Sequence, residues 1–294
     1  MHRLLTWVVE PGFVSSGPVH VALTVGVTAA VVSAVVGVFT VLRGQSFAGH
    51  ALTDVAATGG SGALLAGVGA LPGFLVFGLL GAGAMDLIGV RRVRGRDLAT
   101  GIVLGATTGL TALVLFQDTT ARATTGAAQQ VLFGSIFTVP FTTAVVSLVL
   151  GAAAMVAVAV LYRPLLLSSV HPDIAAARGV HERAVGVAFM GTLAVAAGLS
   201  AVAIGAILST ALLIGPAAAA LRLTQRVGAA IVVAGLIGAG ATALGVLLAY
   251  DSYYWGSSRR GLPVSFCVVV VVVAAYAISG IRARFDRSRR VVRG

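Results

Sequence analysis

Residues 184–221 read AVGVAFMGTLAVAAGLSAVAIGAILSTALLIGPAAAAL, and these 38 residues include no Asp, Glu, Lys or Arg. As a single α-helix the run would measure about 57 Å, at roughly 1.5 Å per residue. The hydrocarbon core of a bilayer is only about 30 Å thick. We therefore expect the run to fold back near residues 198–205 and to cross a membrane twice.

The composition of the whole chain is also typical of a membrane protein. Of its 294 residues, 58% are hydrophobic and 10% are charged, and the mean hydropathy is +1.03. A soluble domain has about 25% charged residues. Three further runs without charge, at 19–42, 55–85 and 98–117, are long enough to span a bilayer. Strand-length alternation is absent, so the expected fold is an all-α integral membrane protein.

The apolar runs predict a polytopic bundle of eight or nine transmembrane helices. The nine expected spans are 19–42, 47–68, 71–90, 98–117, 139–161, 184–200, 204–221, 228–250 and 262–281. They form a transmembrane domain over 19–281, between an N-terminal interfacial arm at 1–18 and a basic cytoplasmic tail at 282–294. The apolar patch 131–139 is too short to cross, and we expect it to be re-entrant or interfacial.

The distribution of arginine predicts the orientation of the chain. All 20 basic residues are arginines. If the spans alternate, sixteen of them fall on the side of Arg43, and only Arg3, Arg122, Arg259 and Arg260 fall on the other. Cytoplasmic loops carry an excess of positive charge, so the N-terminus is expected outside and the C-terminus inside. A basic groove lined with aromatic residues is not visible, and a nucleic-acid partner is therefore not expected.

Motifs for catalysis are missing from the sequence. The chain has no lysine, so it lacks the Walker A lysine and cannot be a P-loop ATPase. Neither a Gly-x-Ser-x-Gly elbow nor a His-Glu-x-x-His helix is present. The single cysteine, Cys267, excludes an internal disulfide and a multi-cysteine metal centre. We expect no catalytic residue and no permanently bound cofactor, and any ATP drive must come from another chain.

His50 and Asp54 are ionisable residues expected at membrane depth. Their spacing puts both on one helix face, one turn apart. A charged side chain at the centre of a spanning helix costs roughly 2.5–3.5 kcal/mol, so such residues face the bundle interior and usually have a function. Imidazole and carboxylate ligands suit Mn, Fe and Zn. The pair could bind a metal, relay protons or serve structure alone, and two copies facing each other would bring four ligands together.

Two other features allow more than one interpretation. Gly59, Gly60 and Gly62 permit close helix packing or a local break beside a pathway, and Pro216 should kink its span. Asp86 lies five residues before Arg91, which indicates an interfacial cap or an ion pair.

Five segments, in this order, resemble the manganese/zinc/iron-type ABC transporter permeases, the ABC-3 family. They are VLRGQSFAGHALTDVAATGGSG at 41–62, LFGSIFTV at 132–139, HPDIAAARGV at 171–180, GAILSTALLIGPAAAALRL at 205–223, and a tyrosine-rich loop with Pro263. The resemblance covers about residues 20–281. It implies a bacterial inner-membrane permease that imports a divalent transition metal (Mn, Zn or Fe) by alternating access. It also implies a homodimer, a separate ATP-binding-cassette ATPase subunit and an extracellular metal-binding protein.

The resemblance assigns roles to particular residues. The family's second span carries an Asp with a His four residues later, whereas this chain has the same two ligand types in reversed order, at His50 and Asp54. The loop 163–183 could be an ordinary loop or a docking element. The resemblance favours a short coupling helix that docks on the ATPase, with His171, Pro172, Asp173, Ala176, Arg178 and Gly179 in the matching segment. The alternative is a proton- or ion-coupled secondary transporter in which His50 and Asp54 relay protons.

Overall fold

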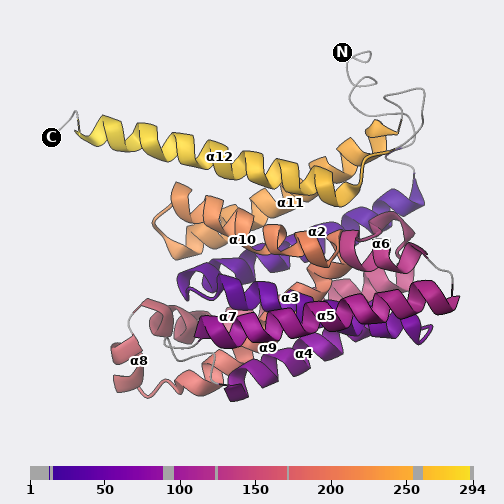
Figure 1. Cartoon of the computed structure of the whole chain (residues 1–294). Helices are drawn as coiled ribbons and strands as arrows, with labels where there is room; N and C mark the ends of the chain where they lie inside the picture. Colours follow the sequence, from indigo (N-terminus) through magenta and orange to yellow (C-terminus); the bar gives the residue numbers. More distant parts are fainter. Residues whose placement is uncertain are drawn as a thin grey trace, which may run out of the picture.

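The computed structural model describes residue 13 and residues 16–88, 96–122, 125–170, 172–253 and 261–291 (Figure 1). Within them all regular structure is helical, as predicted. The elements are α2 Gly17–Leu42, α3 Ser46–Leu65, α4 Ala70–Ile88, α5 Arg96–Arg122, α6 Thr125–Phe133, η1 Ile136–Thr138, α7 Phe141–Val170, α8 Pro172–Ala177, α9 Glu182–Ile204, α10 Ala206–Leu223, α11 Val227–Ser252 and α12 Val264–Val291. Most of the expected N-terminal arm, His171 and the last three residues of the expected tail lie outside the described residues.

Eight helices in the described part of the chain are long and apolar enough to cross a membrane, namely α2, α4, α5, α7, α9, α10, α11 and α12. The ninth long helix, α3, has 20 residues but is less apolar. It is packed among α4, α5, α9 and α10. A helix of this length spans about 30 Å. Because its neighbours surround it, α3 can contain polar side chains that do not face lipid.

The helices alternate in direction between two ends of the bundle (Figure 1). One end holds α8, the turn between α2 and α3, and the turn between α10 and α11, whereas α6 lies at the other end. Arg43 follows α2, Arg178 follows α8, and Arg222 is in the last turn of α10. These arginines therefore collect at the end with α8, which the charge asymmetry assigns to the cytoplasm.

The charge-free run 184–221 folds back at Gly205, within the predicted interval. Gly205 ends α9 and begins α10 with φ +81° and ψ 160°, a conformation that is essentially restricted to glycine. A Cβ at Gly205 would overlap the backbone between Leu132 and Gly134. The end of α6 thus lies directly against this turn. The patch 131–139 accordingly forms the end of α6 and the short helix η1, not a span.

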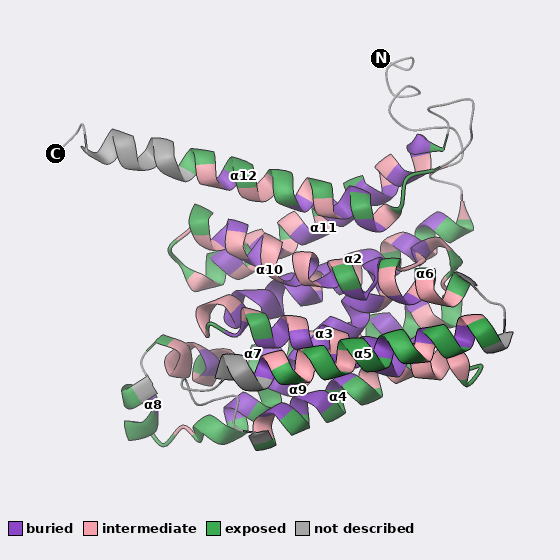
Figure 2. Ribbon diagram, viewed as in Figure 1, coloured by how far each residue is buried: buried purple, intermediate pink, exposed green. Residues whose placement is uncertain are grey.

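Burial divides the bundle into central and peripheral helices (Figure 2). Within an apolar stretch of 18 residues, 72% of the residues are buried in α2 and in α9. The corresponding share is 17% in α5 and 28% in α7 and α12. The peripheral helices expose large apolar side chains such as Phe141, Val160 and Ile278. An apolar exterior of this kind is stable in lipid and would not be in water.

Candidate metal site

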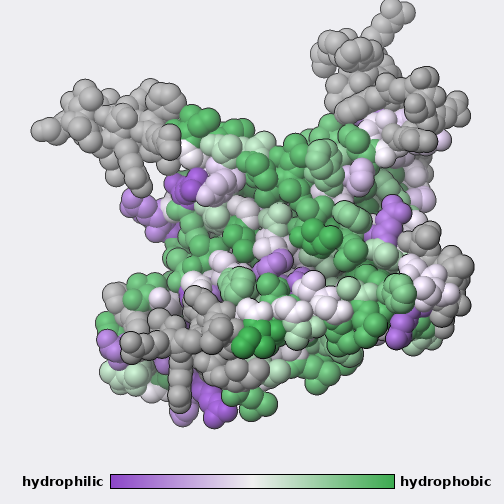
Figure 3. Space-filling view, in the orientation of Figure 1, coloured by the Kyte–Doolittle hydropathy of each residue, from purple (hydrophilic) through white to green (hydrophobic). Residues whose placement is uncertain are grey.

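His50 and Asp54 lie on the side of α3 that is flanked by α5 and α10. Helix α3 contacts both neighbours, whereas α5 and α10 make few or no contacts with each other in the described part of the chain. Both side chains are half-buried. Figure 3 shows hydrophilic and neutral surface in the band between α10 and α5, with hydrophobic surface on either side. The structure therefore places the two predicted ligands on one side of α3, with His50 against α10 and Asp54 against α5.

The imidazole of His50 is held by α10. Its Nδ1 atom lies 2.8 Å from Oγ1 of Thr210. In the tautomer whose Nδ1–H donates to this hydroxyl, Nε2 keeps a lone pair that can bind a metal. A second hydrogen bond of this kind is the usual way in which a metal-binding histidine is oriented.

The carboxylate of Asp54 is held by α5. The Thr108 hydroxyl donates to Oδ2 of Asp54 over 3.0 Å. The same hydroxyl lies 2.8 Å from the Leu104 carbonyl, so its single hydrogen is shared between two acceptors. Asp54 therefore retains an oxygen, Oδ1, that could bind a cation.

A second polar contact joins α3 to α5 one turn beyond Asp54. The buried hydroxyls of Thr58 and Thr111 lie 2.7 Å apart, and Thr58 also donates to the Thr107 carbonyl over 3.0 Å. Hydroxyls that bond across helices help to hold membrane helices together. This contact fixes the part of α5 that carries Thr108 relative to α3.

His50 and Asp54 are two potential metal ligands on one helix. No cluster of three or more His, Cys, Asp and Glu residues capable of binding a metal occurs among the described residues. His50 and Asp54 supply two ligands, whereas a tightly held divalent transition metal usually has four or more. Two ligands alone would hold such a metal weakly.

The glycines of α3 do not interrupt the helix, which is continuous from Ser46 to Leu65. A Cβ at Gly59 would overlap the backbone of Gly73 on α4, and one at Gly60 would lie 2.7 Å from the Phe74 ring. Close packing therefore accounts for both residues. A Cβ at the third glycine, Gly62, would have open space around it to 4 Å, and a role for this residue in a pathway stays a prediction.

Pro216 is buried inside α10, which continues on both sides of it. Proline lacks a backbone N–H and removes one hydrogen bond of the helix. The turn of α10 before Pro216 contains Leu213. A Cβ built on Gly37 of α2 would overlap the carbonyl oxygen of Leu213, so the two helices are in close contact there. The proline thus lies at a close contact between α10 and α2, and its expected kink stays a prediction.

The segment expected to couple to an ATPase forms the short helix α8. Asp173 and Ala176 in α8 are exposed, as are Arg178 and Gly179 just after it, whereas Ala175 is buried. Gly179 has φ +74° and donates to the Ala176 carbonyl, while Val180 donates to Ala175. This is the Schellman arrangement that commonly ends a helix at glycine. His171 and the side chain of Pro172 lie outside the described residues.

Asp86 forms an ion pair, which was one of its two predicted roles. Its carboxylate lies 3.9 Å from the guanidinium of Arg183 at the start of α9. The expected neighbour Arg91 lies outside the described residues. The pair joins α4 to the segment that follows α8.

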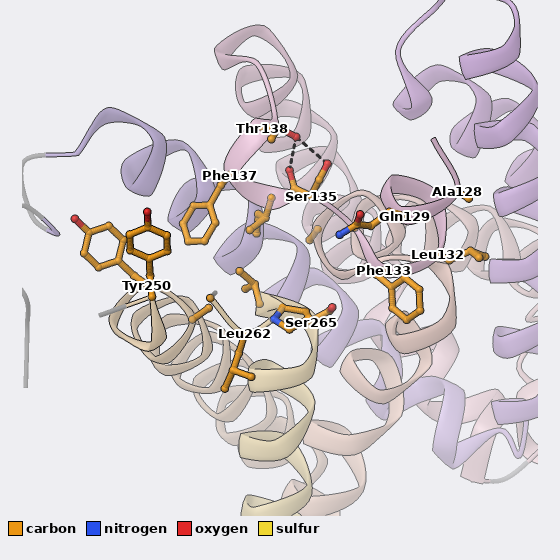
Figure 4. Close-up of a pocket in the computed structure, with 18 residues that line it drawn as sticks. Ala128, Gln129, Leu132, Phe133, Ser135, Phe137, Thr138, Tyr250, Leu262 and Ser265 are labelled. Atoms are coloured by element: carbon orange, nitrogen blue, oxygen red, sulfur yellow. Dashed lines mark hydrogen bonds between the residues drawn. The ribbon is translucent and has the colours of Figure 1, made fainter. Parts of the chain in front are cut away.

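A separate cavity of about 760 Å³ opens at the outer end, between α6 with η1 and the facing ends of α11 and α12 (Figure 4). Phe133, Phe137 and Tyr250 contribute to its walls, and the hydroxyls of Ser135 and Thr138 bond to each other. None of the described residues that line it is His, Cys, Asp or Glu.

Thr108, Thr210 and Arg43 are absent from the predicted site residues, although all three contribute to this part of the molecule. The two threonines orient His50 and Asp54, and Arg43 connects the turn before α3 to α7. Threonine is common in spanning helices, where it bonds to the carbonyl four residues earlier. No local pattern therefore distinguishes these two threonines from the others.

A bundle of apolar spanning helices that holds a few polar and ionisable side chains and exposes a short helix at one end is typical of the membrane-spanning subunit of a transporter. The chain belongs to the ABC 3 transport family, whose profile matches residues 18–282. It is thus a multi-pass ABC transporter permease and not a catalytic subunit, and the secondary-transporter alternative is set aside.

The chain is similar to curated manganese transport proteins. It is 28% identical over 263 residues to the manganese transport system membrane protein MntC of Listeria innocua, covering 90% of this chain and 91% of the relative. It is 27% identical over 258 residues to the manganese import system permease protein ScaB of Streptococcus pneumoniae, covering 88% of each. Among solved structures, PsaBC from Streptococcus pneumoniae in complex with Fab matches with a TM-score of 0.78 and 25% identity, over 91% of this chain and 92% of that chain.

Proposed function

We propose that this chain is the permease of a manganese importer, and that His50 and Asp54 bind Mn²⁺ during its passage. The observation that carries the proposal is the half-site between α5 and α10, in which one imidazole nitrogen and one carboxylate oxygen remain available. The carboxylate is a ligand type that suits Mn²⁺, and imidazole binds several first-row transition metals. The two relatives described above are both named as manganese transport proteins.

The working unit in this proposal is a homodimer, because two half-sites supply four ligands. Helix α5 is suited to the contact, since it is the least buried and the least apolar of the eight candidate spans. It carries Gly101, Gly105 and Gly109 at four-residue intervals, and no atom lies within 4 Å of a methyl group built on any of them. Small residues at this spacing let membrane helices approach closely. Two α5 helices that meet along this stripe would place both copies of Thr108 and Asp54 near the twofold axis.

The proposed cycle uses two partners. A metal-binding protein delivers Mn²⁺ at the outer end, and an ATP-binding-cassette subunit docks on α8 at the inner end. A site with few protein ligands binds weakly enough to release its cargo. Movement of the inner ends of the helices, driven by the ATPase, then alternates access to His50 and Asp54.

An elemental profile of whole cells tests this function. A strain lacking the gene is complemented with the wild-type chain or with an empty vector, and cell-associated Mn, Fe and Zn are measured under manganese limitation. We expect the wild-type chain to restore Mn at least severalfold, with smaller changes in Fe and Zn. Restoration of Zn or Fe without Mn would overturn the choice of metal. Restoration of no metal by a chain shown to reach the membrane would overturn import.

A further inference from the structure

The inner end of α7, which leads directly into α8, is fastened to the turn between α2 and α3. An Arg43 guanidinium nitrogen, Nη1, donates to the Ser168 hydroxyl over 3.0 Å. The guanidinium carbon lies 5.6 Å from the centre of the Phe189 ring on α9, so the cation also faces an aromatic ring. One half-buried side chain thus contacts the helix before α8 and the helix after it.

Neighbouring contacts make this junction firm. The rings of Phe39 on α2 and Tyr162 on α7 pack edge to face with their centres 6.0 Å apart. Phe189 and Leu165 are fully buried beside them. Packed interiors transmit displacement because they have little free volume. A displacement of the inner end of α7 should therefore be carried to the turn that holds Arg43.

The same turn begins α3, the helix that carries the ligands. Arg43 caps α2 through a hydrogen bond from its backbone N–H to Phe39, and Gln45 donates to the Thr40 carbonyl over 2.8 Å. His50 is only seven residues after Arg43, near the start of α3. Few residues therefore separate the guanidinium from the proposed metal ligand.

We propose that Arg43 couples α8 to α3, so that movement of the ATPase at α8 repositions His50 and Asp54. This inference rests on the proposed function. Arginine suits the role because its planar guanidinium can bond to Ser168 and face Phe189 at once, which the lysine ammonium does less well. Arg43 is a positioning residue and does not contact the metal.

The experiment uses the permease reconstituted in vesicles with its ATPase subunit and its metal-binding protein, and measures both ATP hydrolysed and Mn²⁺ taken up. The variants are Arg43→Gln, Arg43→Lys and Ser168→Ala. The matched control is Arg222→Gln, because Arg222 also lies at the inner end and also bonds to and faces an aromatic residue, Tyr276, with 3.9 Å between guanidinium carbon and ring centre. The contact between Arg222 and Tyr276 joins α10 to α12, and neither of these helices packs extensively against α7 or α8 in the described part of the chain.

We expect Arg43→Gln to keep ATP hydrolysis within about twofold of wild type while Mn²⁺ uptake falls at least tenfold, so that ATP used per ion rises. Ser168→Ala should raise this ratio to a lesser degree, Arg43→Lys should be intermediate, and the control should not change it. A double variant that combines Arg43→Gln with Ser168→Ala should resemble Arg43→Gln alone, since both changes remove the same hydrogen bond.

An unchanged ratio in Arg43→Gln and Ser168→Ala would overturn the inference, as would an equal rise in the control. If Arg43→Gln does not fold, Ser168→Ala decides alone, because it removes a single hydroxyl. Failure of the proposed function has a different signature, since the wild-type complex would then hydrolyse ATP without taking up Mn²⁺.

Discussion

The Nδ1 atom of His50 lies 2.8 Å from the hydroxyl oxygen of Thr210, and this contact joins α3 to α10. A matching contact of 3.0 Å joins Asp54 to Thr108 on α5. Each proposed ligand is thus oriented by a different helix. A relative movement of α5 and α10 would therefore reorient the two side chains of the proposed site.

Thr210→Val should weaken metal binding while preserving the size of the side chain. Loss of a hydrogen bond to a metal-binding histidine typically lowers metal affinity 10- to 100-fold. We expect the Mn²⁺ concentration for half-maximal uptake to rise by about that factor. Thr210→Ser keeps the hydroxyl and should stay near wild type, and equal values for the valine and serine variants would show that the contact does not orient His50.

Gly105→Leu should separate the dimer, because it places a large side chain in the stripe on α5 that two copies would share. We expect the detergent-solubilised chain to shift from dimer to monomer by light scattering and to lose Mn²⁺ uptake. Gly240→Leu is the control, since Gly240 on α11 is also exposed and also has open space around it. A dimer that persists in Gly105→Leu would exclude this face as the contact.

Ile174→Asp should impair docking of the ATPase subunit. Ile174 is 46% exposed on α8, an unusual position for a large apolar side chain at the cytoplasmic end. We expect its replacement by a charge to reduce co-purification of the ATPase at least tenfold. Gln225→Asp adds the same charge to the inner turn between α10 and α11 and should have little effect. Normal co-purification in Ile174→Asp would mean that the ATPase binds elsewhere.

Gly205→Ala should destabilise the fold. A non-glycine residue in this backbone conformation costs about 1–3 kcal/mol, and the added Cβ would also overlap the end of α6. We expect a clear decrease in the unfolding temperature of the solubilised chain. Gly240→Ala places the same methyl group in open space and should leave that temperature unchanged or slightly higher. Equal temperatures for the two variants would contradict the role given to the turn.

The spans and their reversal at Gly205 could be predicted because both depend on local features, namely charge-free length and a glycine between two helical runs. The His50 and Asp54 pair was visible for the same reason, since four residues make one turn. The side chains that orient the pair were not visible. Thr210 and Thr108 lie 160 and 54 residues from their partners, and Ser168 lies 125 residues from Arg43. Such contacts depend on which helices become neighbours.

The glycines of α3 show a second limit of sequence patterns. Gly59 and Gly60 fit a helix break and a close contact equally well, and only the position of Gly73 and Phe74 on α4 selects the contact. Asp86 was similar, since the sequence indicated a cap or a nearby arginine. Its partner is Arg183, which the fold brings from the far side of α8.

Uptake of Mn²⁺ by vesicles that contain the whole complex, with His50→Ala and Asp54→Ala compared with wild type, tests the central claim most directly. Both variants should lose uptake while still forming the dimer and binding the ATPase, and His20→Ala, which alters an exposed histidine at the outer end of α2, should transport normally. Wild-type uptake rates in both ligand variants would contradict the claim that these two residues bind the metal.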